Sequence, residues 1–442
     1  MSNYKQLYWI VFVAANGGLL LGLNMAGISG AVNSIQSFFN LNDHALGIVV
    51  SSLIIGCLFG ASSTGYFIEK YGRKKVLLFS SILFVISSLA CALAQSYISL
   101  VIFRFIGGIG VGIVSVAVPV YISEISPPKM RGMLVSFHTL AVVTGILLAY
   151  IFNYLFIDLA NGWRYMLAFP FLFSILFLIL ILSFLPESPR WSIANGRKIN
   201  AYNVLKKIHG YELAKEEIKD IENSFYKKTK KISFKNIFKE KIRKIVFLCA
   251  ILAIFQQLVG INAVINYAPI IFQKTGVGGN IVLLQSIFIG IANFLATFIV
   301  LIFIDSKGRK TLLIWGAVGM TLTLAYISYG FAFNVDNFGI LIAILLYIAF
   351  FAASFASIFG VITSELFSNH FRGVAMSFTS TINWIFTFIV VQFSPYALNR
   401  FGGSVLFGIF ALSSFLALIF VKIWIPETKG KSLEEIEKEL TI

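Results

Sequence analysis

Charged residues are scarce in this sequence of 442 residues. They make up 12% of the chain, about half the share of a typical soluble domain, while hydrophobic residues make up 58% and the mean hydropathy is +0.88. Apolar runs of about 20 residues, the length that crosses a bilayer, recur roughly a dozen times between Tyr8 and Trp424. The first run precedes no small-residue cleavage site, so it is interpreted as a helix and not as a signal peptide. The composition excludes a soluble domain and predicts an all-α integral membrane protein.

Cysteine and histidine are also rare. The three cysteines, Cys57, Cys91 and Cys249, all lie inside apolar runs, where they are expected to pack as small side chains without forming a disulfide. The four histidines lie far apart and show no metal-ligand spacing. No span carries a nucleophile with a base. We therefore expect no metal, no cofactor and no enzymatic activity.

The charges that are present fall on one side of the predicted membrane. Sixteen of the 35 Lys and Arg residues lie between Arg190 and Lys244, whereas the alternate loops carry only Arg164, Lys274 and Arg400. This asymmetry follows the positive-inside rule and predicts that both termini and the central loop are cytoplasmic. The net charge of +16 does not indicate a nucleic-acid partner, because no basic face interleaved with aromatics is present. The partner expected for this apolar protein is the lipid bilayer.

Twelve spans fit the hydropathy pattern. They are predicted at 8–37, 45–67, 76–95, 98–124, 133–156, 164–184, 245–272, 281–303, 311–333, 339–364, 373–396 and 403–424. The chain then divides into a six-helix bundle at 1–184, a cytoplasmic linker with short amphipathic helices at 185–244, a second six-helix bundle at 245–424, and a cytoplasmic tail at 425–442. A short helix is expected at 432–440, with Ser432 as its N-cap.

The two halves repeat each other. The segment that begins at Gly65 recurs at Leu301, an offset of 236, and the segment that begins at Pro186 recurs at Pro426, an offset of 240. A third repeat joins an acid, Glu124 or Glu365, to an arginine seven residues later. Prolines follow Glu124, so this acid and its arginine are expected on successive helices. Three matches in order predict two parallel halves related by an axis along the membrane normal.

These motifs resemble those of the sugar porter family of the major facilitator superfamily. The residues that carry the resemblance are the paired Gly-Arg-Lys loops, Pro119–Gly132, Arg104 with the glycines that follow it, Gly162–Arg164, Pro186–Trp191, Gln256-Gln257 and Pro426–Gly430. The resemblance covers nearly the whole chain. It implies a major facilitator fold of twelve transmembrane helices in two bundles, around a central cavity that opens alternately to each side.

Polar residues inside spans indicate where a ligand binds, because lipid tolerates them only in cavities or with partners. The densest set is Gln256, Gln257, Asn262 and Asn266, followed by Tyr267. A single amide is explained by contacts between helices, but four amides within eleven residues favour a cavity lining. Amides donate and accept hydrogen bonds, as a polyhydroxylated ligand requires. A neutral sugar therefore fits best.

The resemblance adds residues to this candidate site. It implies sugar-binding roles for Gln256, Gln257, Asn262, Asn293, Phe351, Asn383 and Trp384. Two positions depart from the family pattern, since Gly360 replaces a stacking tryptophan and Ile146 replaces a glutamine. An unusual sugar or a polyol is thus left open as the substrate.

Charged residues at the predicted helix ends form a second candidate group. Their repeated spacing favours a cytoplasmic gate over a role in topology alone, and in the family such residues form salt bridges that release as the halves rock. The members are Glu69, Arg73, Glu124, Arg131, Glu187, Asp305, Arg309, Glu365 and Arg372.

Coupling to protons is predicted from one position. The family counterpart of Arg104 faces an aspartate in the first span of proton-coupled members, and here that position is Asn24. Amides do not titrate, so we expect facilitated diffusion of a neutral monosaccharide by a monomer. A sugar:proton symporter, with His138 as the remaining titratable candidate, is the alternative. A carrier-like sugar sensor is a more distant one.

Overall fold

The structure is a computed structural model that describes residues 4–127, 130–211, 214–215, 217–219, 221, 240–274, 281–333, 335, 337–367 and 372–429. Its first half contains α1 (Tyr4–Ala26), α2 (Val32–Phe39), α3 (Asp43–Tyr71), α4 (Arg73–Ala92), α5 (Tyr97–Ile125), α6 (Arg131–Phe156) and α7 (Gly162–Phe184). Two linker helices follow, α8 (Pro189–Ala194) and α9 (Lys198–His209). The second half contains α11 (Glu240–Leu258), α12 (Ile261–Lys274), α13 (Ile281–Lys307), α14 (Arg309–Phe333), α15 (Asn337–Phe351), α16 (Ser357–Leu366) and α17 (Arg372–Trp424).

The predicted membrane fold is confirmed. Within the described residues, eleven helices are long and apolar enough to cross a bilayer. One of them, α17, is 53 residues long and bends at Gly402, where φ is +83°, so it accounts for the last two predicted spans. Large apolar side chains cover the outside of the bundles, and Leu172 and Trp315 are 67% and 69% exposed. Lipid accommodates such a surface, while the helices satisfy their own backbone groups.

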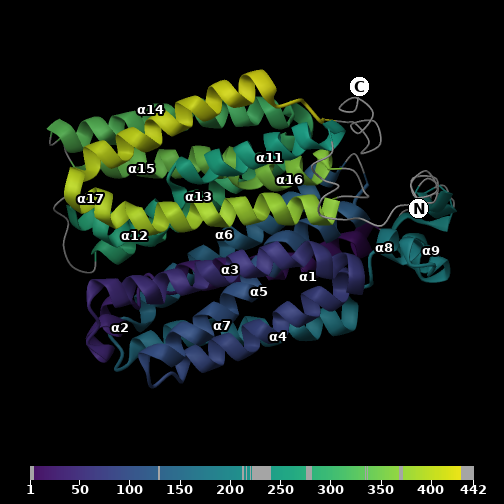
Figure 1. Cartoon of the computed structure of the whole chain (residues 1–442), viewed down its shortest axis with the longest axis horizontal. Coiled ribbons are helices and arrows are strands. Elements are labelled where there is room, and N and C mark those ends of the chain that lie inside the picture. The colour runs from purple at the N-terminus through teal and green to yellow at the C-terminus, as the bar shows by residue number, and fades with distance from the viewer. Residues whose placement is uncertain are drawn as a thin grey trace.

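The helices form two bundles that lie side by side (Figure 1). Helices α1 to α7 build the first bundle and α11 to α17 the second. The bundles meet where α3 packs along α17 and α6 packs along α13. At the first of these contacts, the backbone N–H of Gly65 donates to Ser377 Oγ at 2.6 Å. The two contacts are equivalent under the sequence repeat, as an axis between the halves requires.

Three predicted spans contain a break in the structure, and the first of them was predicted too long. The first ends at Ala26, and α2 follows as a separate helix. The seventh breaks between α11 and α12 at Gly260, where φ is +92° and a Cβ would collide with the ring of Phe410. In the tenth, α15 and α16 are joined by a π-helical turn at Ala352–Ala356.

The linker helices mark one end of the molecule. Helices α8 and α9 lie beyond the end of the first bundle (Figure 1), and we call this side the linker end. Ile193, Ala201 and Leu205 form a small core there with Ala214 and Ile221. The helix expected at 432–440 lies outside the described residues.

Candidate transport pathway

A cavity of about 210 Å³ lies between the two bundles. Its lining comes from α1, α5 and α6 of the first half and from α11, α12, α13, α15, α16 and α17 of the second. Among the described residues that line it there is no Asp, Glu, Lys or Arg, and His138 is the one histidine. A charged solute would therefore find no opposite charge in this cavity, whereas a neutral polar ligand is not penalised.

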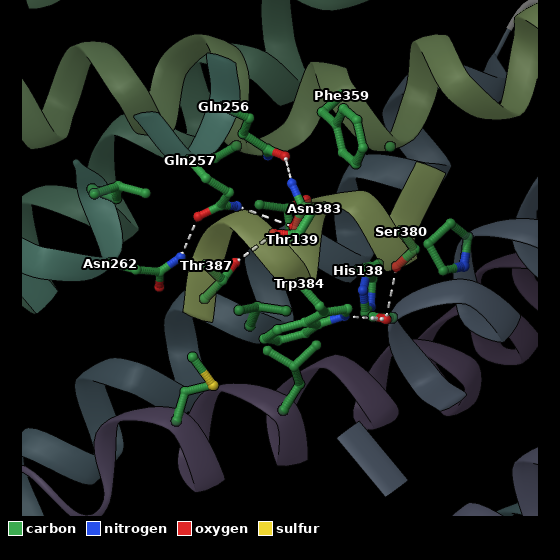
Figure 2. A pocket seen from close by; sticks show the side chains of 18 of the residues that line it. His138, Thr139, Gln256, Gln257, Asn262, Phe359, Ser380, Asn383, Trp384 and Thr387 are labelled. Atoms are coloured by element: carbon green, nitrogen blue, oxygen red, sulfur yellow. Dashed lines mark hydrogen bonds between the residues drawn. The ribbon is translucent and has the colours of Figure 1, made fainter. Parts of the chain in front are cut away.

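Amide side chains form a connected chain of hydrogen bonds on one wall of the cavity (Figure 2), which we call the amide relay. Asn262 Nδ2 donates to Gln257 Oε1 at 2.6 Å, and Gln257 Nε2 donates to Asn383 Oδ1 at 3.1 Å. Asn383 Nδ2 then donates to Gln256 Oε1 at 2.7 Å, and Gln256 Nε2 donates to Phe355 O at 3.1 Å. Asn383 lies at the centre of the relay, since it is bonded to both glutamines.

The relay depends on the break in the seventh span. Gln256 and Gln257 lie near the end of α11, and Asn262 lies near the start of α12. On one continuous helix each side chain is rotated by about 100° from the one before, so Asn262 and Gln257 would point to different sides of the helix. The turn at Gly260 instead brings the amide of Asn262 onto Gln257. The sequence singled out these amides, and the break in the span brings them together.

Asn266 lies apart from the amide relay. Its Nδ2 donates to Asn262 O at 2.8 Å, within its own helix, and the residue is not part of the cavity lining. The other expected residues, Asn293, Phe351, Asn383 and Trp384, do line the cavity. Asn293 is 3% exposed, and within the described part of the chain its Oδ1 accepts no hydrogen bond.

Hydroxyl groups extend the polar lining toward the first half, and sequence reasoning missed them. Trp384 Nε1 donates to Ser115 Oγ at 3.2 Å, across the interface between α17 and α5, and Ser115 lies 3.4 Å from Ser380 Oγ (Figure 2). Thr387 Oγ1 donates to Asn383 O at 2.9 Å. Single hydroxyls occur throughout the apolar spans, so the sequence carries no signal that singles these out.

The remaining wall is apolar and leaves space beside α16. Leu21, Met25 and Ile146 face the cavity from the first half, and Phe359 and Gly360 face it from the second. A Cβ placed on Gly360 would meet no atom within 4 Å. The glycine therefore enlarges the cavity at the position where the sequence pattern leads one to expect a tryptophan.

At the linker end, an arginine joins three acids within the first half. Arg73 Nη2 lies 2.8 Å from Glu124 Oε1 and 3.0 Å from Glu69 Oε1. Ser188 Oγ donates to the other oxygen of Glu124. The backbone N–H of Arg73 donates to Glu187 Oε1 at 2.8 Å. We call these five residues the first-half network.

The second half repeats this network residue by residue. Arg309 Nη2 lies 2.8 Å from Glu365 Oε1, and Arg309 Nη1 lies 2.9 Å from Asp305 Oδ1. Thr428 Oγ1 donates to Glu365 Oε2 at 2.7 Å, and the backbone N–H of Arg309 donates to Glu427 Oε1 at 2.9 Å. Sequence reasoning missed Glu427 and Thr428, although the offset of 240 equates them with Glu187 and Ser188.

One acid of each network also reaches the other half. Asp305 Oδ2 accepts from the backbone N–H of Met133 at 3.0 Å, in the first turn of α6. A Cβ on Gly132 would lie 2.5 Å from Asp305 Oδ1, and a Cβ on Gly373, near the start of α17, would lie 2.8 Å from Glu69 Oε1. Carboxylates are stabilised at helix N-termini, where N–H groups lack partners within the helix. These contacts hold the two halves together at the linker end.

The remaining gate candidates are placed as follows. Arg131 is buried at the start of α6, and the side chain of Arg372 lies outside the described ones. Burial raises the pKa of the Glu187 carboxyl above its usual range, while the N–H groups of Ser188, Lys74 and Arg73 oppose that shift.

The predicted coupling residues lie around the same cavity inside the first half. Asn24 on α1 and Arg104 on α5 line one small cavity, separate from the central one. Asn24 Nδ2 donates to Leu20 O at 2.8 Å, and Arg104 Nε donates to Val49 O at 2.8 Å. Arg104 is 4% exposed.

Comparison with known proteins places the chain in a family. The family model described as "Sugar (and other) transporter" matches residues 10–440. The chain belongs to the sugar porter family of the major facilitator superfamily. This sugar porter is therefore a multi-pass membrane transporter and not an enzyme.

Relatives of this sugar porter include carriers of both mechanisms. It is 36% identical to the arabinose-proton symporter of Bacillus subtilis, with 96% of this chain and 93% of that protein covered. It is 37% identical to the glucose facilitated diffusion protein of Zymomonas mobilis, with 97% and 96% covered. Among solved structures, the proton:xylose symporter XylE of Escherichia coli, bound to 6-bromo-6-deoxy-D-glucose, has a TM-score of 0.92 at 34% identity, over 99% of this chain and 100% of that chain.

Proposed function

We propose that this sugar porter moves a neutral monosaccharide across the membrane by facilitated diffusion. The amide relay supports the substrate class. Gln256, Gln257, Asn262 and Asn383 present donors and acceptors to the cavity, which matches alternating hydroxyl groups. Asn293 Oδ1 supplies an acceptor that no described protein group occupies. Phe351 and Trp384 add aromatic surface for the apolar faces of a sugar ring.

The absence of an acid beside Arg104 supports facilitated diffusion. A symporter needs a group that gains and loses a proton during each cycle, and the amide of Asn24 cannot do so. The small cavity that Asn24 shares with Arg104 is lined by no Asp or Glu among the described residues. The relatives include both mechanisms, so they favour neither.

Alternating access would use the two linker-end networks as a gate. Closure rests on the contacts of Asp305 and Glu69 with the helix starts of the opposite half. Opening would break these contacts while Arg73–Glu124 and Arg309–Glu365 stay intact inside their own halves. We propose that the linker end and both termini are cytoplasmic, on the basis of the basic linker, and that one chain suffices, because the described lining of the cavity comes from both halves of a single chain.

Two alternatives, one for the substrate and one for the mechanism, have support from specific residues. The open space beside Gly360 would accommodate a polyol or a substituted sugar. A sugar:proton symporter would use His138, which lines the central cavity. A sugar sensor would bind the ligand without exchanging it.

Counterflow in proteoliposomes tests the proposal. Vesicles preloaded with one unlabelled sugar are diluted into the labelled sugar, and the panel covers hexoses, pentoses, polyols and an amino acid. We expect transient accumulation of at least one neutral sugar, with the Asn383→Ala variant and protein-free vesicles as controls. Binding without counterflow would favour the sensor, and counterflow of the amino acid alone would contradict the substrate class.

A further inference from the structure

Arg104 lines a second cavity that lies within the first bundle. Asn24, Ser87, Ser88 and Cys91 contribute to its walls, and it shares no lining residue with the central cavity. Its volume of about 10 Å³ admits one small group, such as a water molecule or a monatomic ion. This cavity is therefore distinct from the candidate sugar site.

The charge of Arg104 has no counter-charge in the described protein. The guanidinium stays protonated at any physiological pH, and its residue is 4% exposed. Its Nε donates to Val49 O, which is a neutral partner. Glu69, Glu124 and Glu187 are engaged with Arg73 at the linker end. A buried cation without a counter-charge is strongly destabilising in a membrane protein.

The other polar groups of this cavity do not neutralise it. Ser87 Oγ donates to Phe103 O, and Ser88 Oγ donates to Phe84 O, so both hydroxyl hydrogens are used. Asn24 Nδ2 uses one hydrogen in its bond to Leu20 O and keeps the second. The cavity thus combines a full positive charge with a spare amide N–H, which together suit an anion.

We propose that Arg104 and Asn24 bind a small monovalent anion of halide size, with chloride as the ligand. The anion takes the place that a carboxylate at position 24 would otherwise fill, and it compensates the guanidinium. The inference concerns charge balance inside the first bundle. It does not rest on the proposed sugar specificity or on facilitated diffusion, and it is tested without sugar.

Thermal unfolding of the purified protein in detergent tests this site. Sodium chloride, sodium bromide and sodium gluconate are titrated at matched ionic strength, and Tm is recorded. Binding to the folded state predicts a saturable rise of Tm, on the order of a few degrees, in chloride and bromide but not in gluconate. Equal Tm values in all three salts would overturn the proposal and leave Arg104 solvated by water.

The variant Asn24→Asp sharpens the test, because its carboxylate would occupy the anion position. We expect its Tm to be the same in chloride and gluconate. Asn16→Asp is the matched control, since Asn16 lies on the same helix with its amide bonded to Phe12 O, and it should keep the chloride response. A chloride response that survives in Asn24→Asp would contradict the assignment. If Asn24→Asp does not fold, crystals of the parent grown in bromide decide the matter, because the proposal requires an anomalous bromide peak in contact with Arg104.

Discussion

Replacing Asn383 by Ala is expected to weaken sugar binding more than replacing Asn262, the terminal member of the amide relay. The substitution removes the hydrogen bonds to Gln256 and Gln257 together, so neither glutamine is held toward the ligand. A hydrogen bond contributes about 1 kcal/mol. Losing two bonds and the ligand's own contact should therefore reduce affinity by about 2–3 kcal/mol, or roughly 30- to 150-fold.

The terminal residue of the relay gives a graded comparison. Asn262→Ala removes one relay bond, to Gln257, together with the ligand's own contact, and should reduce affinity by about 1–2 kcal/mol, or roughly 5- to 30-fold. Asn266→Ala is the matched control, because this amide lies on the same helix but outside the cavity, and affinity should be unchanged. Equilibrium binding of the best labelled sugar to purified protein measures all three variants, and Tm confirms that each is folded. Equal losses for Asn266→Ala and Asn383→Ala would refute the relay as the binding wall.

Two further predictions concern the gate and the enlarged cavity. Asp305→Asn should weaken the contact with the start of α6 by about 1 kcal/mol and raise the population open at the linker end roughly fivefold, measured as faster labelling of cysteines placed there. Glu124→Gln affects a pair with Arg73 inside one half, so it should lower Tm but change cysteine labelling less than Asp305→Asn does. A larger change in labelling for Glu124→Gln than for Asp305→Asn would contradict the assignment. Gly360→Trp should fill the open space and reduce uptake of substituted sugars by about tenfold more than uptake of pentoses. Gly360→Ala should leave both rates unchanged, and a uniform loss in both variants would instead indicate misfolding.

Much of the fold can be predicted from the sequence because membrane helices are recognisable by their length and apolar composition. The repeat between the halves also makes Arg309 equivalent to Arg73, and Glu365 equivalent to Glu124. In the structure Arg73 pairs with Glu124, and Arg309 pairs with Glu365 in the same way. Glu427 was within reach of the same reasoning, since its offset from Glu187 is 240 residues.

The helix breaks were harder to foresee. Gly260 lies in an apolar run whose hydropathy does not change at the break, so the sequence gives no sign of the turn that brings Asn262 onto Gln257. The contact of Trp384 with Ser115 joins residues 269 positions apart and depends on how the bundles dock. Hydrophobic periodicity describes single helices and holds no information about that docking.

Uptake under an imposed proton gradient tests the central claim most directly. Proteoliposomes that contain the parent protein are given an inward proton gradient, and the internal concentration of the labelled sugar is followed to its plateau. Facilitated diffusion predicts a plateau at the external concentration, with and without a protonophore. Accumulation above that level that collapses when the protonophore is added would contradict the account, and His138→Ala would then be the next variant to measure.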